Sequence, residues 1–417
     1  MSKKIFAVNA GSSSLKFQLL DMPSKHVIAK GIFEKIGSQQ GIFTMEFKGR
    51  KEKELLDLPS HQFAVQHLLD ALLKQQVIRS LDEIDGVGHR VAHGGESFGD
   101  SVYVDERVMS IIEELAFLAP SHNPVNLTGI AAFKKALPQV GNVAVFDTAF
   151  HQSLRPEFFC YPIPSRYYER YQIRKYGFHG TSHQYIAEKV AALWEEQGES
   201  AADLRIISCH LGNGASICAI KNGCSVNTSM GFTPLAGLMM GSRSGDIDPM
   251  ILPFLMQQEG LTAQAISDLL NKESGLLAVS QLSNDVRDIV EASQQGDGKA
   301  ALALQMFVNR IAQTVAAYIT DLAGLDALVF TAGIGEHSAL IREMVINKLN
   351  CLGLFLNPSA NEQGQLFIQN KDSKAKILIV PTDEELMIAQ DTMRILELEQ
   401  QSSEIQTHKV ARTGHTT

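Results

Sequence analysis

The chain has 417 residues, of which 45% are hydrophobic and 20% are charged, and its formal net charge at pH 7 is -9. These are globular values, and no run of about eighteen uncharged apolar residues indicates a membrane span. The acidic balance, without an extended Lys/Arg cluster, argues against nucleic-acid binding. The short apolar run after the N-terminal lysines is atypical of a signal peptide. The five cysteines include no C-x-x-C pair, so we expect a reduced, cytoplasmic protein without disulfides or a zinc ribbon.

Short, nearly continuous apolar runs predict strands that are buried on both faces. In chain order they cover residues 4–10, 142–148, 205–211, 326–333 and 376–382. Between them, apolar residues recur every three or four positions, which predicts helices. The clearest helices cover residues 62–75, 106–118, 184–196, 301–322 and 384–398. Buried strands mixed with helices indicate an α/β protein.

Two stretches about two hundred residues apart resemble each other. "KIFAVNAGSSSLKFQLLDM" and "RIISCHLGNGASICAIKNG" each contain an apolar strand, a polar residue, a Gly/Ser/Asn turn and an alternating strand. A period this long indicates duplication of a whole domain, because solenoid repeats span roughly 20 to 50 residues. We therefore predict two similar lobes, 1–150 and 151–383, with the boundary near the prolines of residues 150–164. Residues 400–417 are polar and without periodicity, and we predict a flexible tail there.

The turns of the two similar stretches are candidate phosphate-binding sites. Gly11, Gly212 and Gly214 let backbone N–H groups approach an anion, while neighbouring serines add donors and Lys16 adds a charge. The alternative is a tight β-hairpin whose glycines only supply positive φ. A third glycine segment, "TAGIGEHS" at residues 331–338, follows a strand and precedes a predicted helix at 339–349. It suits a base or ribose, or is a simple strand-to-helix turn.

Arginine, histidine and carboxylate side chains follow several of these strands. Arg90 and Arg243 suit bidentate binding of carboxylate or phosphoryl oxygens, although loop arginines are often surface ion-pair partners. His179 lies between two glycines, and its alternative is a packed, hydrogen-bonded side chain. Asp147 and Glu384 are placed for a magnesium ligand or a proton acceptor, unless the segment at Glu384 only caps a helix. Such a set suits phosphoryl transfer, which needs positioning, a metal and cations more than covalent help.

The chain resembles the acetate kinase family, which includes propionate kinase, from residue 3 to about 395. The resemblance rests on ordered motifs: "NAGSSSLKFQLLD", "HRVAHGG", "APSHNP", "VFDTAFHQ", "YGFHGTSH", "CHLGNGAS", "TSMGFTPLAGLMMGSRSGDIDP", "SNDVRDI", "FTAGIGEHS" and "PTDEELMIA". It implies the fold of the acetate and sugar kinase, Hsp70 and actin superfamily: two duplicated ribonuclease H-like lobes around a central cleft. It also implies a homodimer formed through the second lobe, and a C-terminal helix, 384–398, that returns to the first lobe.

The implied reaction is reversible transfer of the ATP γ-phosphoryl group to acetate or propionate, giving an acyl phosphate and ADP with Mg²⁺, or Mn²⁺ in its place. The motifs place catalytic roles on Asp147, His179 and Arg243 and substrate contacts on Arg90, Ala92 and His122. Metal ligands would be Asn9 and Glu384. Nucleotide contacts would come from Lys16, His210, Leu211, Gly212, Asn213, Gly214, Asp285, Val286, Arg287, Gly333, Ile334, Gly335, Glu336 and His337.

Three positions depart from the family pattern. His337 and Asp383 each stand where the family usually has Asn, beside the base and the metal respectively. Ala92 is similar to propionate kinases, whereas acetate kinases often carry Val, so its smaller side chain leaves room for one more methylene. Propionate kinase as the main activity is one alternative function. The other is a superfamily relative that uses ATP only to change shape.

Overall fold

The computed structural model describes residues 2–413, with side chains through residue 402. The chain divides into two compact units. Unit 1 consists of the described parts of Met1–Ala149 and Asp383–Thr417, and unit 2 is Phe150–Thr382. Among the described residues, no helix combines the length and the apolar character needed to cross a bilayer.

Unit 1 is built on an eight-stranded sheet in the order β5-β4-β3-β2-β1-β6-β8-β7. Strands β1, β6 and β8 are parallel, and the other neighbours are antiparallel. The strands are β1 (Lys3–Gly11), β2 (Ser14–Met22), β3 (His26–Glu34), β4 (Ser38–Phe47), β5 (Arg50–Leu58), β6 (Ile84–Val91), β7 (Val102–Tyr103) and β8 (Gly141–Phe146).

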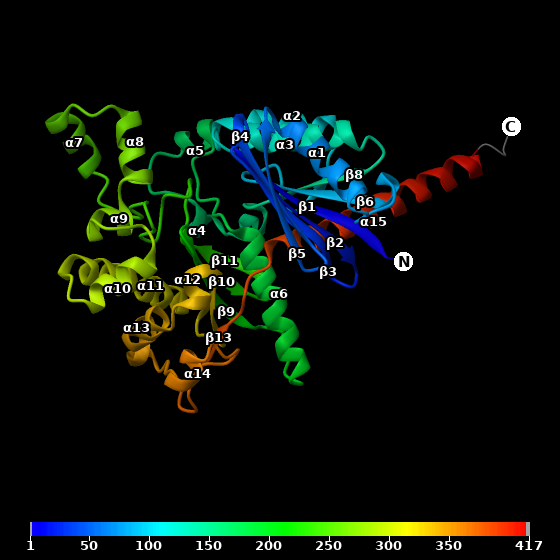
Figure 1. Cartoon of the computed structure of the whole chain (residues 1–417). Helices are drawn as coiled ribbons and strands as arrows, with labels where there is room; N and C mark the ends of the chain where they lie inside the picture. The colour runs from blue at the N-terminus through cyan, green and yellow to red at the C-terminus, as the bar shows by residue number, and fades with distance from the viewer. Residues whose placement is uncertain (1, 414–417) are drawn as a thin grey trace. The chain divides into compact units, whose positions relative to one another are not determined.

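Helices cover both faces of this sheet (Figure 1). On one face, α1 (His61–Lys74) and α3 (Asn123–Ala136) pack on an aromatic core that includes Phe6, Phe17 and Phe133. On the other face, α15 (Glu384–Thr413) lies against β1, β6 and β8. Glycines allow this close approach: a Cβ on Gly88 would lie 2.1 Å from Thr392 Oγ1. A short helix α2 (Glu106–Glu114) and two 3₁₀ turns, Leu81–Glu83 and Leu115–Phe117, complete the unit.

Unit 2 contains a five-stranded sheet in the order β11-β10-β9-β12-β13. Its strands are β9 (Arg205–Leu211), β10 (Ala215–Lys221), β11 (Cys224–Thr228), β12 (Ala327–Thr331) and β13 (Lys376–Ile379). Strand residues alternate between two cores, as a period of two requires. Ile207, Cys209 and Leu211 face one core, and Ile206 faces the other.

A helical layer lies on each side of the unit 2 sheet. Helix α6 (Gly180–Glu196) packs on one face, and α11 (Gly298–Leu322) with α13 (Ala339–Leu349) packs on the other. The remaining helices are α4 (Pro156–Phe159), α5 (Arg166–Tyr171), α7 (Ile251–Glu259), α8 (Ala263–Lys272), α9 (Gly275–Ser280), α10 (Val286–Gln294), α12 (Ala332–His337) and α14 (Pro358–Glu362). Two 3₁₀ turns cover Ala149–Ser153 and Asn350–Leu352.

The predicted duplication is confirmed by topology. The order β3-β2-β1-β6-β8 in unit 1 repeats as β11-β10-β9-β12-β13 in unit 2, with the same parallel and antiparallel pairings. Each unit therefore has the strand order of the predicted ribonuclease H-like lobe, extended in unit 1 by β4, β5 and β7.

Several predicted boundaries differ from the structure. The helix predicted over 106–118 ends at Glu114, and the strand predicted over 326–333 ends at Thr331, where α12 begins. The C-terminal helix predicted over 384–398 continues to Thr413, so the predicted flexible tail is helical up to that residue. Residues 414–417 lie outside the described residues.

Candidate active site

Both predicted phosphate-binding turns form β-hairpins. The hairpin alternative assumed that their glycines supply positive φ. Gly11 pairs with Ser14 at the end of β1, and Gly212 N–H donates to Gly214 O at 3.1 Å between β9 and β10. None of Gly11, Gly212 and Gly214 has positive φ. Positive φ therefore does not explain these glycines. At Gly11 the glycine is explained by close approach, because a Cβ there would lie 2.7 Å from Ser14 Oγ.

In unit 1, three predicted residues meet where parallel strands end. Arg90 in β6 holds Asp147, which follows β8, through two N–H groups: Nε donates to Oδ1 at 3.1 Å, and a terminal nitrogen donates to Oδ2. A further N–H of Arg90 reaches Asn9 Oδ1 in β1 at 3.4 Å. Asp147 is buried, and its charge raises the pKa of Arg90. The guanidinium is thereby held in one orientation with a permanent charge.

Glu384 opens α15 beside this pair. Burial raises the pKa of its carboxyl to about 7; Arg90 opposes the rise and Asp147 adds to it. Asp383 accepts the Leu386 N–H at 2.9 Å, so the capping alternative is correct for Asp383, whose own pKa burial raises. Lys16 forms an ion pair with Glu385.

The donor set in unit 1 fits a hard cation. Asn9 offers an amide oxygen and Glu384 a carboxylate, the ligand types that Mg²⁺ takes in small numbers beside water and phosphate oxygens. Within residues 2–413, no group of three or more His, Cys, Asp or Glu side chains is arranged to hold a metal by itself.

The predicted acyl-pocket residues occupy different settings. Ala92 is buried, and its N–H donates to Asn126 Oδ1 at 3.0 Å. Asn126 in turn donates to Ala10 O at 3.0 Å, which ties this segment to the end of β1. His122 is the exposed residue that precedes α3.

In unit 2, the predicted imidazole and guanidinium converge on the second turn. His179 precedes α6 with a left-handed φ of 56°, and its ring stacks on His210 at 4.2 Å between centroids. A Cβ on Gly214 would lie 3.5 Å from His179 Nε2 and 3.7 Å from Arg243 Nη1. Desolvation lowers the pKa of Arg243, whose Nη1 donates to Pro234 O at 3.3 Å. A positive charge and an imidazole thus lie at one glycine turn.

The loop that carries Arg243 is fitted to the same turn. Gly241 N–H donates to Asn213 O at 3.2 Å, and a Cβ on Gly241 would lie 1.9 Å from Asn213 Oδ1. A side chain at position 241 would therefore push the loop away from the turn.

A hollow of about 720 Å³ brings the predicted nucleotide segments together. Its lining contains residues of the glycine turn, of the start of α10 and of α12: Gly212, Asn213, Asn284, Asp285, Val286, Arg287, Val290, Gly333, Ile334, His337 and Ser338. Asp285 caps α10 and pairs with Arg287, so both side chains are held at the rim. The predicted nucleoside loop is in fact the short helix α12.

Other predicted nucleotide residues do not line this hollow. Leu211 is in the core, and Glu336 accepts the Thr382 N–H at 3.2 Å. His210 is bonded to Ser182 Oγ at 2.8 Å, while Gly335 is packed under β12. Sequence reasoning missed Asn284, Val290 and Ser338, which directly flank or follow the predicted motifs. Ser216 is one of the serines predicted to add donors at the second turn, but in the structure its Oγ lies 3.0 Å from His179 Nδ1, a contact that the sequence did not predict.

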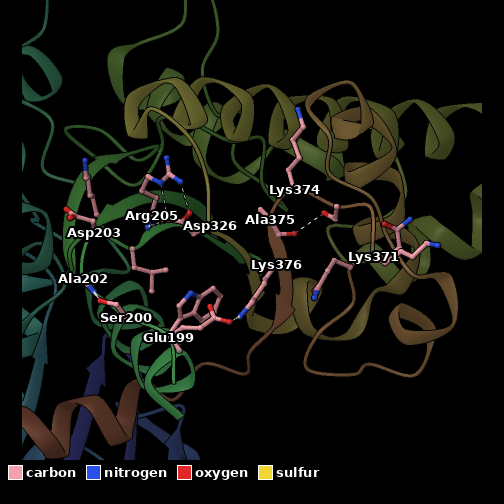
Figure 2. A pocket seen from close by; sticks show the side chains of 16 residues that line it. Glu199, Ser200, Ala202, Asp203, Arg205, Asp326, Lys371, Lys374, Ala375 and Lys376 are labelled. Carbon is pink, nitrogen blue, oxygen red and sulfur yellow. Dashed lines mark hydrogen bonds and ion pairs between the residues drawn. The ribbon is translucent and has the colours of Figure 1, made fainter. Parts of the chain in front are cut away.

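A second, larger hollow of about 880 Å³ lies at the opposite ends of the unit 2 strands (Figure 2). Arg205, Ala327 and Lys376 are the first residues of β9, β12 and β13. The charged side chains that line this hollow largely pair with one another: Arg205 pairs with Asp326 at 2.6 Å, and Lys376 pairs with Glu199 at 2.9 Å. None of the predicted site residues lines it, so size alone does not identify the site.

Comparison with known proteins identifies the family of this chain. A sequence profile described as the acetokinase family matches residues 4–390. The chain is 53% identical to acetate kinase 2 of Listeria monocytogenes over 395 residues, which covers 94% of this chain and 99% of that one. It is 51% identical to the acetate kinase of Bacillus subtilis over 394 residues, with 94% and 99% covered.

Solved structures of the same group superimpose closely. The acetate kinase of Porphyromonas gingivalis matches with a TM-score of 0.90 and 44% identity, covering 94% of this chain and 100% of that one. A propionate kinase of Francisella tularensis matches with a TM-score of 0.89 and 39% identity, with the same coverage. The profile match and these relatives span nearly the whole described fold, and the chain therefore belongs to the acetokinase family.

Proposed function

We propose that this protein is an acetate kinase that transfers the γ-phosphoryl group of ATP reversibly to acetate. An oxygen of the carboxylate bonds to the γ-phosphorus while the bond from that phosphorus to the β–γ bridging oxygen breaks, which gives acetyl phosphate and ADP. The observation that carries the proposal is the 720 Å³ hollow joined to the His179–Arg243 turn, in a chain about half identical to acetate kinases.

Unit 1 supplies the acceptor side of this proposal. Arg90 binds the carboxylate, and Asp147 holds the guanidinium in place through its two hydrogen bonds. In this role Asp147 orients the acceptor through Arg90. Ala92 lies against the acyl group, and His122 supports the site from the start of α3.

Unit 2 supplies the donor side. The hollow holds the nucleoside, and the turn from His210 to Gly214 approaches the phosphates with backbone N–H groups. His179 and Arg243 stabilise negative charge on the phosphoryl oxygens while the phosphorus passes from the β–γ bridging oxygen to the carboxylate oxygen. Lys16 is the cation that the hairpin of unit 1 offers to a phosphate; in the structure it forms an ion pair with Glu385.

Asn9 and Glu384 are the residues that would hold Mg²⁺ or Mn²⁺. When bound, the cation would neutralise charge on the phosphate oxygens. The Glu384 carboxyl, with a pKa raised to about 7, would bind a metal best in its ionised form, which Arg90 favours.

A hydroxamate assay tests the proposed function. The protein is mixed with ATP, Mg²⁺, hydroxylamine and acetate, propionate or no carboxylate. We expect acyl hydroxamate and ADP in equal amounts, formed only when a carboxylate is present. ATP loss that is indifferent to carboxylate would instead support the ATP-driven switch, and a higher kcat/KM for propionate would support propionate kinase as the main activity.

We also propose that the protein is a cytoplasmic homodimer that associates through unit 2. Large apolar side chains are exposed on α7, the segment before it, and α11: Ile247, Met250, Ile251, Phe254, Met256, Leu302 and Met306. Arg310 of α11 donates to Asp246 O at 3.1 Å, which joins α11 to the segment that precedes α7. Exposed apolar area of this kind marks association surfaces. Sedimentation of the parent and of Phe254→Glu tests it: a dimer that the substitution dissociates is expected, and a monomeric parent would refute it.

A further inference from the structure

A chain of buried serine and histidine side chains leads to His179 from inside unit 2. Ser216 Oγ lies 3.0 Å from His179 Nδ1 and 2.8 Å from His183 Nε2. The other nitrogen of His183, Nδ1, lies 3.0 Å from Ser208 Oγ. Ser208, Ser216 and His183 have no exposed surface. The chain therefore runs from the core of the unit to one ring nitrogen of His179.

Secondary structure builds this chain from regular spacings. Positions 206, 208 and 210 of β9 face α6, and antiparallel pairing sets Ser216 of β10 opposite His210 on the same face. On the helix side, His179 and His183 are one turn apart, and the His183 N–H donates to His179 O at 3.0 Å. The rings and hydroxyls thus meet in the single layer between sheet and helix.

Proton counting limits how the chain is connected. Desolvation holds the pKa of His183 well below 6.5, so this ring is neutral and has one N–H and one lone pair. In one arrangement, Ser216 donates to His183 Nε2 and accepts from His179 Nδ1–H, while His183 Nδ1–H donates to Ser208. In the reverse arrangement, Ser216 donates to His179 Nδ1, which must then be unprotonated.

In both arrangements Nε2 can carry an N–H that meets negative charge, but only the first allows His179 to be positively charged. An imidazolium has an N–H on both nitrogens, and its inner N–H needs an acceptor, which Ser216 supplies when His183 takes the hydroxyl proton. The outer nitrogen, Nε2, is then directed at the glycine turn, 3.5 Å from the Cβ position of Gly214. Arg243 approaches the same position at 3.7 Å.

We propose that Ser216 and His183 are positioning residues for phosphoryl transfer: together they accept the inner N–H of His179 and so aim its outer N–H at the phosphoryl group. This inference rests on the proposed function. Neither residue touches substrate. Their effect passes through His179 and appears in the transition state, where the charge on the phosphoryl oxygens is redistributed.

The first test removes the link. Ser216→Ala is expected to lower kcat roughly 10- to 100-fold, the cost of one hydrogen bond to a charged group, and to leave the KM for ATP within about twofold. The matched control is Ser225→Ala, which deletes an equally buried serine that lies 2.8 Å from His151 Nδ1 and does not contact His179. Ser225→Ala should keep kcat within about threefold at a similar loss of Tm.

Two substitutions of His183 distinguish a positioning role from a packing role. His183→Gln retains an acceptor where Nε2 lies and should keep much of kcat, whereas His183→Leu fills the space without an acceptor and should behave like Ser216→Ala. In a His179→Ala background, Ser216→Ala should have no further effect on kcat, because it acts only through the missing ring.

Distinct results would overturn the inference. A Ser216→Ala enzyme with kcat near that of the parent would do so, as would equal losses in Ser216→Ala and Ser225→Ala, or equal losses in His183→Gln and His183→Leu. If the parent itself forms no acyl hydroxamate, the proposed function fails and this inference fails with it. An active parent with unaffected variants refutes the positioning roles alone.

Discussion

The two units share one strand order but carry different chemistry at the carboxyl ends of their parallel strands. In unit 1 this region carries two ion pairs, Arg90 with Asp147 and Lys16 with Glu385, and the Glu384 carboxyl beside them. In unit 2 the corresponding end carries a glycine turn, stacked imidazoles and Arg243.

This difference indicates how two units with the same strand order can take different parts in one reaction. The repeated order of strands fixes where side chains can gather, because parallel strands bring their carboxyl ends to one edge. The residues placed there then diverged. In unit 1, carboxylate and amide oxygens suit a cation, and an arginine suits a carboxylate. In unit 2, N–H groups and cations suit phosphate oxygens.

The largest expected effect tests the chemistry assigned to unit 2. Arg243→Ala and His179→Ala should each lower kcat by about 10²- to 10³-fold, as loss of one preorganised donor does, with little change in the KM for ATP. Steady-state kinetics with acetate and ATP measures both constants.

The control for this prediction lies at the opposite end of the same sheet. Arg205→Ala removes a partly exposed ion pair with Asp326, worth at most about 1 kcal/mol of stability, and should leave kcat unchanged. If Arg205→Ala impaired turnover as much as Arg243→Ala, the assignment of chemistry to the carboxyl end would be wrong.

The second prediction concerns acid stability, to which a buried histidine contributes in each unit. Burial lowers the pKa of His89, bonded to Asn142 at 2.8 Å, to about 4, and it also lowers the pKa of His183 well below 6.5. The unfolded chain binds these protons near pH 6.5 and the folded chain does not, so stability present above pH 6.5 is lost as pH falls toward 4. For His89 the loss is at most about 3 kcal/mol.

Urea unfolding at pH 7 and pH 5 in the parent and in His89→Gln measures this contribution. The variant should be less stable at pH 7 but should lose less stability on acidification. If the two proteins show the same difference in unfolding free energy between the two pH values, His89 does not contribute to the acid response.

Much of this difference between the two units could be predicted from the sequence, and the features that could not be predicted were missed for physical reasons. The buried strands predicted over 205–211 and 376–382 were predictable because both faces are apolar, although the second ends at Ile379. β5 was missed because its residues are largely polar and exposed, and β4 because polar residues interrupt its apolar ones. Arg90 and Asp147 were predictable as neighbours because parallel strands end at one edge. The contact between Ser216 and His179 was not, because it requires a side chain of β10 to meet the residue that precedes α6.

The third prediction contrasts two glycines, one in each unit. Gly333 lines the 720 Å³ hollow, and a Cβ there would meet no atom within 4 Å. If this hollow holds the nucleotide as proposed, Gly333→Leu should fill it, raise the KM for ATP roughly tenfold and leave the Tm nearly unchanged, since the position is helical and its Cβ would meet no neighbouring atom. Kinetics and calorimetry on one preparation measure both.

Gly88 in unit 1 should give the opposite result. A Cβ at Gly88 would lie 2.1 Å from Thr392 Oγ1 and 2.6 Å from Ile388 Cγ2, so Gly88→Ala should weaken the packing of α15 by about 1 to 3 kcal/mol without a specific effect on the KM for ATP. Similar behaviour of both variants would mean that Gly333 serves the fold rather than the hollow.

The smallest expected effect concerns the proposed acyl-binding role of Ala92 in unit 1. Ala92 is buried and its backbone is held by Asn126, so Ala92→Val adds volume at a fixed position. Against propionate this should cost about 1 kcal/mol, or roughly fivefold in kcat/KM, while acetate is affected less, because one methylene in an apolar pocket is worth about this much. The ratio of kcat/KM for the two acids, measured in parent and variant, decides the matter. An unchanged ratio would remove Ala92 from the acyl pocket and leave Arg90 as the residue of unit 1 that recognises the acceptor, through its carboxylate alone.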